Sequence, residues 1–194
     1  MLKKLEMDLE FLPYLEQAPM NTAQLHQKAV SNDEATIKHW RDTWIDQARV
    51  NHEKYGPFSS NHVGLLFGLL AHKPCIVLGS GPSLENSIEA LKKNNDLANP
   101  IYVVSCLHNF HYLVDNDINV DLWVSLDAGP VTVEEISEGG KHPHEYYVEK
   151  SKSQRLCAYI ASHPSLIDSW KGEVLWFNCG IPDPKIKEEM EKIE

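Results

Sequence analysis

The chain has 194 residues and a mass of 22.1 kDa, which is room for one domain, or for one domain with an appendage. Hydrophobic residues make up 42% and charged residues 24%, which is close to ordinary globular usage and excludes collagen-like, low-complexity and wholly disordered chains. The 18 Lys and Arg against 28 Asp and Glu give a net charge of −10, so the mean field repels nucleic acid and anionic membranes. A local anion site stays open, because backbone N–H groups bind phosphate at any net charge.

The cysteines and the N-terminus indicate the compartment. The four cysteines are widely spaced with no CxxC pair, which predicts core thiols in a reducing compartment; they are Cys75, Cys106, Cys157 and Cys179. The N-terminal stretch carries acidic residues within its apolar run, unlike a signal peptide. No run approaches the ~20 apolar residues of a membrane-spanning helix. We therefore expect a cytoplasmic protein without a membrane span.

Residues 1–70 form a region of helical character. Apolar residues at helical spacing predict one long amphipathic helix that begins near Ser31 and ends near Tyr55; they are Ile37, Trp40, Trp44 and Ala48. A second apolar series before Pro13 suggests an earlier helix, with Leu5, Leu9 and Leu12. We expect the long helix to pack against the rest of the chain. The alternatives are that Trp40 and Trp44 form a platform for a ligand or a surface for a partner, including a homo-oligomer through these N-terminal helices.

Residues 71–194 show a different pattern, in which short apolar runs alternate with polar helical stretches. This pattern predicts strands at 75–78, 101–104, 122–126, 156–160 and 174–177, and helices at 83–94 and 185–194. Continuous apolar runs are typical of parallel strands that are buried on both faces. We therefore predict an α/β fold with a Rossmann-like, mostly parallel sheet flanked by helices, and an N-terminal helical appendage. The connection at 128–154 is long enough to be either a functional lid or a solvated insertion.

The sharpest local signal is the glycine turn between the first strand and its helix. It predicts a phosphate or carboxylate site, because glycine lets a ligand approach the backbone and proline suits a first helical turn; the residues are Gly79, Ser80, Gly81, Pro82 and Ser83. Leu84 stands where a dinucleotide fingerprint has its third glycine, which disfavours NAD. No lysine follows the glycines as in a Walker loop, so the chemistry of P-loop nucleotide hydrolases is excluded.

Polar residues follow the next two strands, at the edge where open α/β sheets bind ligands. Ser105 and Asn109 follow the second strand, and Asn109 is either a reader of a base or sugar edge or a helix cap. Ser125 and Asp127 follow the third strand. Asp127 is a candidate for binding ribose, for holding Mg²⁺ beside a diphosphate and for acting as a base, or it starts a turn.

The chain has ten histidines, but their spacing gives weak support for a zinc site. His142 and His144 lie within the 128–154 connection. His163 follows the fourth strand and is the best general-base candidate by position, with a solvated loop histidine as the alternative.

Four of these segments together resemble a known family. They are the GxGPSL turn at 79–84, the strand and helix at 101–113, an I-x-x-D stretch at 118–121 and a strand that leads to Asp at 125–127. They resemble the core of the motility accessory factor family of flagellin glycosyltransferases, which shares its domain with archaeal 6-hydroxymethylpterin diphosphokinases. The match covers roughly 60 residues. The turn is also similar to that of bacterial lipooligosaccharide sialyltransferases, whose Cys-Asn-x-Phe stretch is loosely echoed at 106–110.

The resemblance implies a nucleotide-binding transferase in which the glycine turn holds phosphate and Asp127 lies near the reacting group. The leading expectation is a glycosyltransferase that uses a CMP-activated nonulosonic sugar and a protein or glycan acceptor. Pyrophosphate transfer to a pterin is the first alternative, and it would need Mg²⁺ on Asp127 and a second carboxylate. Against it, Ser105 and Cys106 stand where the diphosphokinases have Asp-Gly. A non-catalytic ligand-binding module is the second alternative, since the family continues beyond this C-terminus and we expect the chain to be either a truncated fragment or a shortened variant.

Overall fold

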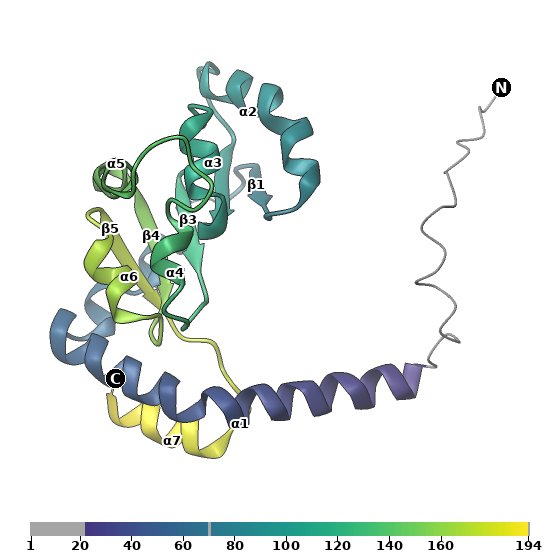
Figure 1. Cartoon of the computed structure of the whole chain (residues 1–194), viewed down its shortest axis with the longest axis vertical. Helices are drawn as coiled ribbons and strands as arrows, with labels where there is room; N and C mark the ends of the chain where they lie inside the picture. Colours follow the sequence, from purple (N-terminus) through teal and green to yellow (C-terminus); the bar gives the residue numbers. More distant parts are fainter. Residues whose placement is uncertain (1–21, 70, 194) are drawn as a thin grey trace. The chain divides into compact units, whose positions relative to one another are not determined.

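A computed structural model describes residues 22–69 and 71–193 of the chain (Figure 1). The first helix, α1 (Thr22–Tyr55), crosses the boundary between two compact units, which lies between Trp40 and Arg41. The predicted long helix is confirmed, with its end at Tyr55 and an earlier start at Thr22. The helix predicted before Pro13 lies outside the described residues. The division into regions 1–70 and 71–194 stays a prediction.

The second unit is built on a sheet of five parallel strands, which confirms the predicted α/β fold class. The strands are β1 (Cys75–Leu78), β2 (Tyr102–Cys106), β3 (Leu122–Ser125), β4 (Arg155–Tyr159) and β5 (Glu173–Phe177). They lie in sequential order from β1 to β5. A doubly wound Rossmann sheet reverses direction at a switch point. The described strands contain no such reversal, so topology alone does not locate a ligand crevice.

Short helices connect and flank the strands. They are η2 (Phe58–Asn61), η3 (Val63–Leu66), η4 (Pro82–Ser87), α2 (Ile88–Asn95), η5 (Leu107–Asn109), α3 (Phe110–Asp115), α4 (Thr132–Glu135), α5 (His144–Lys150), η6 (Ser151–Ser153), α6 (Pro164–Ser169) and α7 (Pro184–Ile193). The 128–154 connection therefore contains α4 and α5. Among the described helices, none is both long and apolar enough to span a membrane.

Both faces of the central sheet are covered. On one face, the Trp123 ring packs edge-on against Phe110 of α3 at 4.8 Å between centroids, and Phe110 in turn meets Trp170 at 5.2 Å. On the opposite face, the buried residues Leu122, Cys157 and Leu175 pack against Val63 and Leu66 of η3. Aromatic and aliphatic burial of this kind supplies most of the driving force for folding.

The edge strand β1 departs from the predicted burial on both faces. Its Cys75 is exposed, and the residue Val77 is 77% exposed. The prediction of a core thiol is therefore wrong for Cys75, and it is also wrong for Cys179, which is exposed. Cys106 is partly buried and Cys157 is buried. Burial raises the pKa of the Cys157 thiol to about 11, as expected for a charge that would have to form away from water.

The C-terminal part of α1 lies across the carboxyl ends of β3 and β4. Gln47 donates from Nε2 to the Ala128 carbonyl at 3.0 Å, just after β3. Asn51 is fully buried and donates from Nδ2 to the carbonyls of Ile160 and Ser162, each at 2.9 Å, just after β4. This half of the helix therefore closes that part of the edge and leaves the ends of β1 and β2 open.

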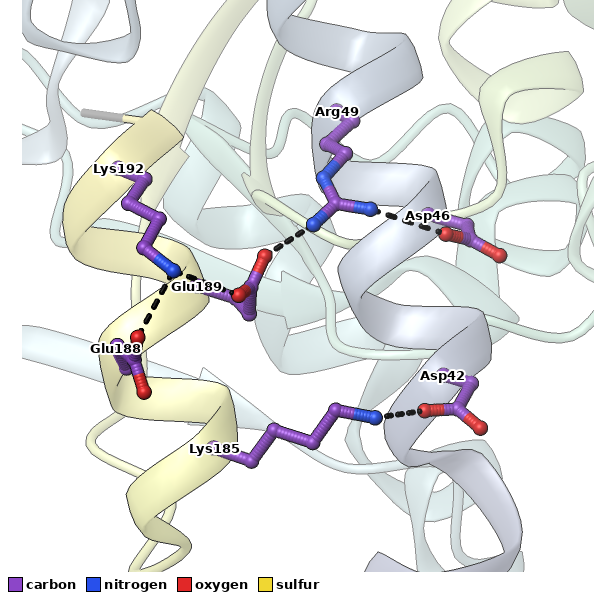
Figure 2. Close-up of polar contacts among 7 residues, drawn as sticks. All are labelled: Asp42, Asp46, Arg49, Lys185, Glu188, Glu189 and Lys192. Atoms are coloured by element: carbon purple, nitrogen blue, oxygen red, sulfur yellow. Dashed lines mark hydrogen bonds and ion pairs between the residues drawn. The ribbon is translucent and has the colours of Figure 1, made fainter.

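Ion pairs join the same part of α1 to α7 (Figure 2). Arg49 pairs with Glu189, and Lys185 donates to Asp42 at 2.9 Å. The hydrogen bond from Lys185 lowers the pKa of the Asp42 carboxyl. These side chains are largely exposed and contribute little individually. The buried apolar residues of α7, Ile186, Met190 and Ile193, carry more of its stabilisation.

Candidate functional site

The carboxyl ends of β1, β2 and β3 surround a cleft of about 420 Å³, the strand-end cleft. Its lining comes from the three strand ends and from α4, and consists of residues 77–79, 104–108, 124–127 and Glu135. Most of this surface is apolar, with the carboxylates of Asp127 and Glu135 among the polar groups. Ligand sites in proteins commonly combine an apolar wall with a few convergent polar groups.

A second cleft of about 350 Å³, the turn cleft, lies beside the glycine turn. It is lined by the turn and η4 on one side and by η5 and α3 on the other: Ser80, Gly81, Pro82, Leu84, Glu85, His108, Asn109, His111 and Tyr112. His108 lines both clefts. The two clefts therefore adjoin and form one candidate site at the edge of the sheet that α1 leaves open.

The clefts bring together most of the residues predicted from the sequence. Gly79, Ser105, Ser125 and Asp127 line the strand-end cleft. Ser80, Gly81, Pro82 and Asn109 line the turn cleft. Ser83 and His163 line neither cleft. The roles assigned to all of these residues stay predictions.

The glycine turn is open on the side that a ligand would approach. Neither Gly79 nor Gly81 has a positive φ, so the backbone does not require glycine at these two positions. A Cβ atom at Gly79 would meet nothing within 4 Å, and one at Gly81 would meet only the Ser83 hydroxyl at 3.8 Å. The space that a side chain would fill is therefore left free beside the turn, as it is where a ligand contacts the backbone closely.

The helix after the turn differs from the prediction. The segment Pro82–Ser87 forms the 3₁₀ helix η4, and the regular α-helix begins only at Ile88. The predicted helix dipole at Pro82–Leu84 is therefore weaker than expected, because a 3₁₀ turn has fewer and less well aligned peptide groups. The Leu84 amide is bonded to the Gly81 carbonyl at 3.0 Å.

Ser105 and Asn109 are tied to each other. Ser105 is fully buried and donates to the Cys106 carbonyl at 3.2 Å, while Asn109 donates from Nδ2 to the Ser105 hydroxyl at 3.1 Å. These bonds fix η5 against the end of β2. They hold in place the stretch of chain that carries His108.

Asp127 begins a turn and also faces the strand-end cleft. Its Oδ1 accepts a hydrogen bond from the Gly129 amide at 2.7 Å, which is the local side-chain-to-backbone bond common at turns. Asp127 therefore takes part in a turn and lines the strand-end cleft at the same time.

Glu135 is a cleft residue that the sequence analysis missed. It lies at the end of α4, with 21% of its side chain exposed and its Oε1 3.9 Å from His108 Nδ1. Burial raises the pKa of the Glu135 carboxyl, His108 opposes this, and Asp127 and Glu138 add to it. A carboxyl with a raised pKa in a cleft is typical of functional sites. The Glu134-Glu135 pair in the long connection was the available signal, but nothing in the sequence placed it beside Asp127.

The histidines outside the clefts have local partners. His163 accepts from the Ser165 amide at 3.3 Å and caps α6. His144 shares a 2.8 Å hydrogen bond with Ser137, and His142 stacks on Tyr146 at 4.1 Å. Within residues 22–69 and 71–193, no group of three or more His, Cys, Asp or Glu is arranged to hold a metal ion. Asp127 and Glu135 are the pair that could contribute to Mg²⁺ binding with a substrate phosphate, since Mg²⁺ uses one or two carboxylates in such sites.

Two of the further cavities, both similar in volume to the clefts, contain none of the predicted residues. One, of about 440 Å³, lies between α7 and the loop at 178–181. The other, of about 350 Å³, lies between β1 and α2 and is mainly apolar. The adjoining clefts are therefore singled out by the predicted residues that line them, and not by their volume alone.

Comparisons with known proteins agree with the resemblance inferred from the sequence. A family model described as "6-hydroxymethylpterin diphosphokinase MptE-like" matches residues 50–193, which include both clefts. No curated protein matches the chain. A solved structure of the MAf glycosyltransferase from Magnetospirillum magneticum AMB-1 is similar at 22% identity and a TM-score of 0.45, over 56% of this chain. This chain spans 16% of that protein's length. The likeness to the sialyltransferase turn stays a prediction.

Proposed function

The chain belongs to the 6-hydroxymethylpterin diphosphokinase MptE-like family, and we propose that it is a transferase that binds a nucleotide-containing donor in the two adjoining clefts. The donor that we propose first is a CMP-activated nonulosonic sugar, with a hydroxyl of a protein or glycan as the acceptor. Family membership supports the transferase class. The identities of the donor and of the acceptor go beyond what family membership supports and are part of our proposal.

One observation carries the proposal: an open glycine turn lies beside a cleft that holds two carboxylates. The turn offers space for a phosphate against the backbone at Gly79 and Gly81. The strand-end cleft offers an apolar wall for a ring and the carboxylates of Asp127 and Glu135 for proton transfer. A nucleotide-dependent transfer needs these elements side by side.

The transfer from a CMP-sugar would proceed by displacement. An acceptor hydroxyl oxygen bonds to the anomeric carbon while the bond from that carbon to the phosphate oxygen breaks, and the electron pair leaves with CMP. The hydroxyl proton passes to a carboxylate of the strand-end cleft. Glu135 suits this step because its raised pKa brings it closer to neutral pH than an ordinary glutamate, which improves a general base. Asp127 is the second candidate.

Pyrophosphate transfer to a pterin is the second candidate function. It requires Mg²⁺, and the sequence analysis placed only Asp127 for it. The position of Glu135 in the same cleft supplies a second carboxylate and so favours this alternative more than the sequence did.

A thermal-shift panel with CMP, CDP, UDP, ATP and a pterin, each with and without Mg²⁺, tests the proposal. A ligand at ~100 times its dissociation constant adds about 2.7 kcal/mol, which corresponds to a rise in Tm of roughly 5–10 °C for a chain of this size. A shift with CMP that does not depend on Mg²⁺ supports the glycosyltransferase. A shift that needs ATP, Mg²⁺ and pterin supports the diphosphokinase. No shift with any nucleotide would leave the non-catalytic module as the better description.

A further inference from the structure

The turn cleft has a second wall that the proposed function does not use. Opposite the glycine turn, His108 of η5 and His111 of α3 line the cleft, three residues apart in one continuous helical segment. Residues at this spacing lie on the same side of a helical segment. The cleft therefore places two imidazole groups across from the open backbone of Ser80 and Gly81.

One ring nitrogen of His111 lacks a hydrogen-bond partner within the described part of the chain. Its Nδ1 is buried and makes no hydrogen bond there. A buried polar atom without a partner is unfavourable and uncommon in folded proteins, and it calls for a partner that is not part of the chain. His111 also lines the turn cleft, where a phosphate oxygen would be an acceptor for an imidazole N–H.

His108 is placed by an acidic neighbour. Its Nδ1 lies 3.9 Å from Glu135 Oε1, and 56% of its side chain is exposed at the junction of the two clefts. His108 is therefore positioned to meet the part of a ligand that passes from the turn cleft into the strand-end cleft.

Acidic side chains from several elements surround the two histidines. Glu135 faces His108 from α4, and Glu135 itself interacts with Asp127 and Glu138. Glu85 and Tyr112 line the turn cleft with the histidines. Glu85 is exposed, so water screens its repulsion of an anion.

We propose that His108 and His111 form the second wall of an anion site in the turn cleft, which binds the phosphate or diphosphate group of the donor between the imidazoles and the glycine turn. The link to a donor rests on the proposed function, but anion binding itself does not require transfer. The phosphate would contact backbone on one side and protonated histidine on the other, a charge-assisted arrangement.

Isothermal titration calorimetry with inorganic pyrophosphate tests the histidine wall directly. We expect His108→Gln and His111→Gln each to weaken binding at least tenfold at pH 6, while His142→Gln, at a histidine that lines neither cleft, leaves it unchanged. Wild-type affinity in both cleft variants overturns the proposal. Because a variant can fail to fold, NMR signals of the two imidazoles in the wild-type protein are followed as well. Signals that do not move on adding pyrophosphate also overturn it.

The pH dependence separates histidine from carboxylate. Sulfate keeps its charge between pH 5.5 and 7.5, whereas histidine side chains in general change charge in this range. We expect sulfate to bind several-fold more tightly at pH 5.5 than at pH 7.5 in the wild type and in His142→Gln, and we expect this difference to disappear in the double variant His108→Gln/His111→Gln. A pH dependence that persists in the double variant would mean that the carboxylates of the clefts carry it, and would overturn the proposal.

The two proposals can fail separately. Pyrophosphate binding that depends on both histidines, without binding of any nucleotide, supports the anion site and refutes the nucleotide donor. Nucleotide binding that is insensitive to both histidine substitutions supports the donor and refutes the histidine wall. A wild-type protein that binds neither pyrophosphate nor sulfate refutes the anion site outright.

Discussion

The substitution Gly81→Val separates a ligand-binding glycine from a structural one. Gly81 has φ −94° and ψ 158°, an extended conformation that valine readily adopts. Its added Cβ would meet only the Ser83 hydroxyl, at 3.8 Å, which is ordinary van der Waals contact. The folded state therefore accommodates the side chain, and the isopropyl group projects into the space beside the turn.

The substitution should raise the stability of the fold and lower the affinity for a nucleotide. Replacing glycine at a compatible backbone position stabilises by about 0.4–1 kcal/mol through the unfolded chain, which corresponds to a Tm that rises by roughly 1–4 °C. The affinity for a phosphate-bearing nucleotide should fall at least tenfold, or about 1.4 kcal/mol, because the side chain occupies the position of the ligand. Differential scanning calorimetry measures the first quantity and isothermal titration calorimetry the second.

Gly180→Val is the matched control. Gly180 also has no positive φ, a Cβ there would meet nothing within 4 Å, and it lines neither cleft. It should tolerate valine equally and leave nucleotide affinity unchanged. If folded Gly81→Val bound nucleotide with wild-type affinity, the reasoning that places phosphate against the turn would be refuted.

Three further outcomes follow from the buried groups. Asn51→Ala should lower the free energy of unfolding by about 2–4 kcal/mol in urea titrations, because two buried carbonyls lose their donor; an unchanged midpoint would contradict the closure of the sheet edge by α1. Glu135→Gln should raise Tm at pH 7 and lower turnover. The pKa of the Glu135 carboxyl is raised in the folded state, so the charged carboxylate destabilises the fold above that pKa. The rise in Tm of the Gln variant must therefore vanish at acid pH, where the carboxyl is protonated in both the folded and the unfolded state. A thiol reagent followed by mass spectrometry should label Cys75 quickly and Cys157 only on unfolding; early modification of Cys157 would contradict its burial and raised pKa.

The elements of the fold were largely predictable because their signals are local. Apolar runs of four or five residues gave the five strands within about two residues, and the helix end at Tyr55 follows from the Gly-Pro pair after it. The strand order was not predictable, since it depends on contacts between residues far apart in the chain. The exposure of Val77 was not predictable either, because an apolar run does not show whether another segment covers that face of the strand.

The candidate site was likewise predictable only where its residues belong to a local sequence pattern. The glycine turn and Asp127 were found because each directly follows a strand, and the carboxyl ends of parallel strands meet at one edge. Glu135 and His111 were missed because helices bring them to the clefts from positions that carry no motif. The 3₁₀ start at Pro82 was missed because apolar spacing over 83–94 does not distinguish it from an α-helical first turn.

The sequential strand order also explains why the site lies at one end of the sheet. A sheet without a reversal has no crevice dictated by topology, so its carboxyl edge is shaped by whatever segments cross it. Here Gln47 and Asn51 bond to the chain after β3 and β4, and their helix occupies the edge there. The space left for a ligand is at the ends of β1 and β2 and along the side of the β3 end that faces them, between the glycine turn and α4. The position of the site thus depends on α1 as much as on the turn, and a loosened α1 should uncover the β4 end of the same edge.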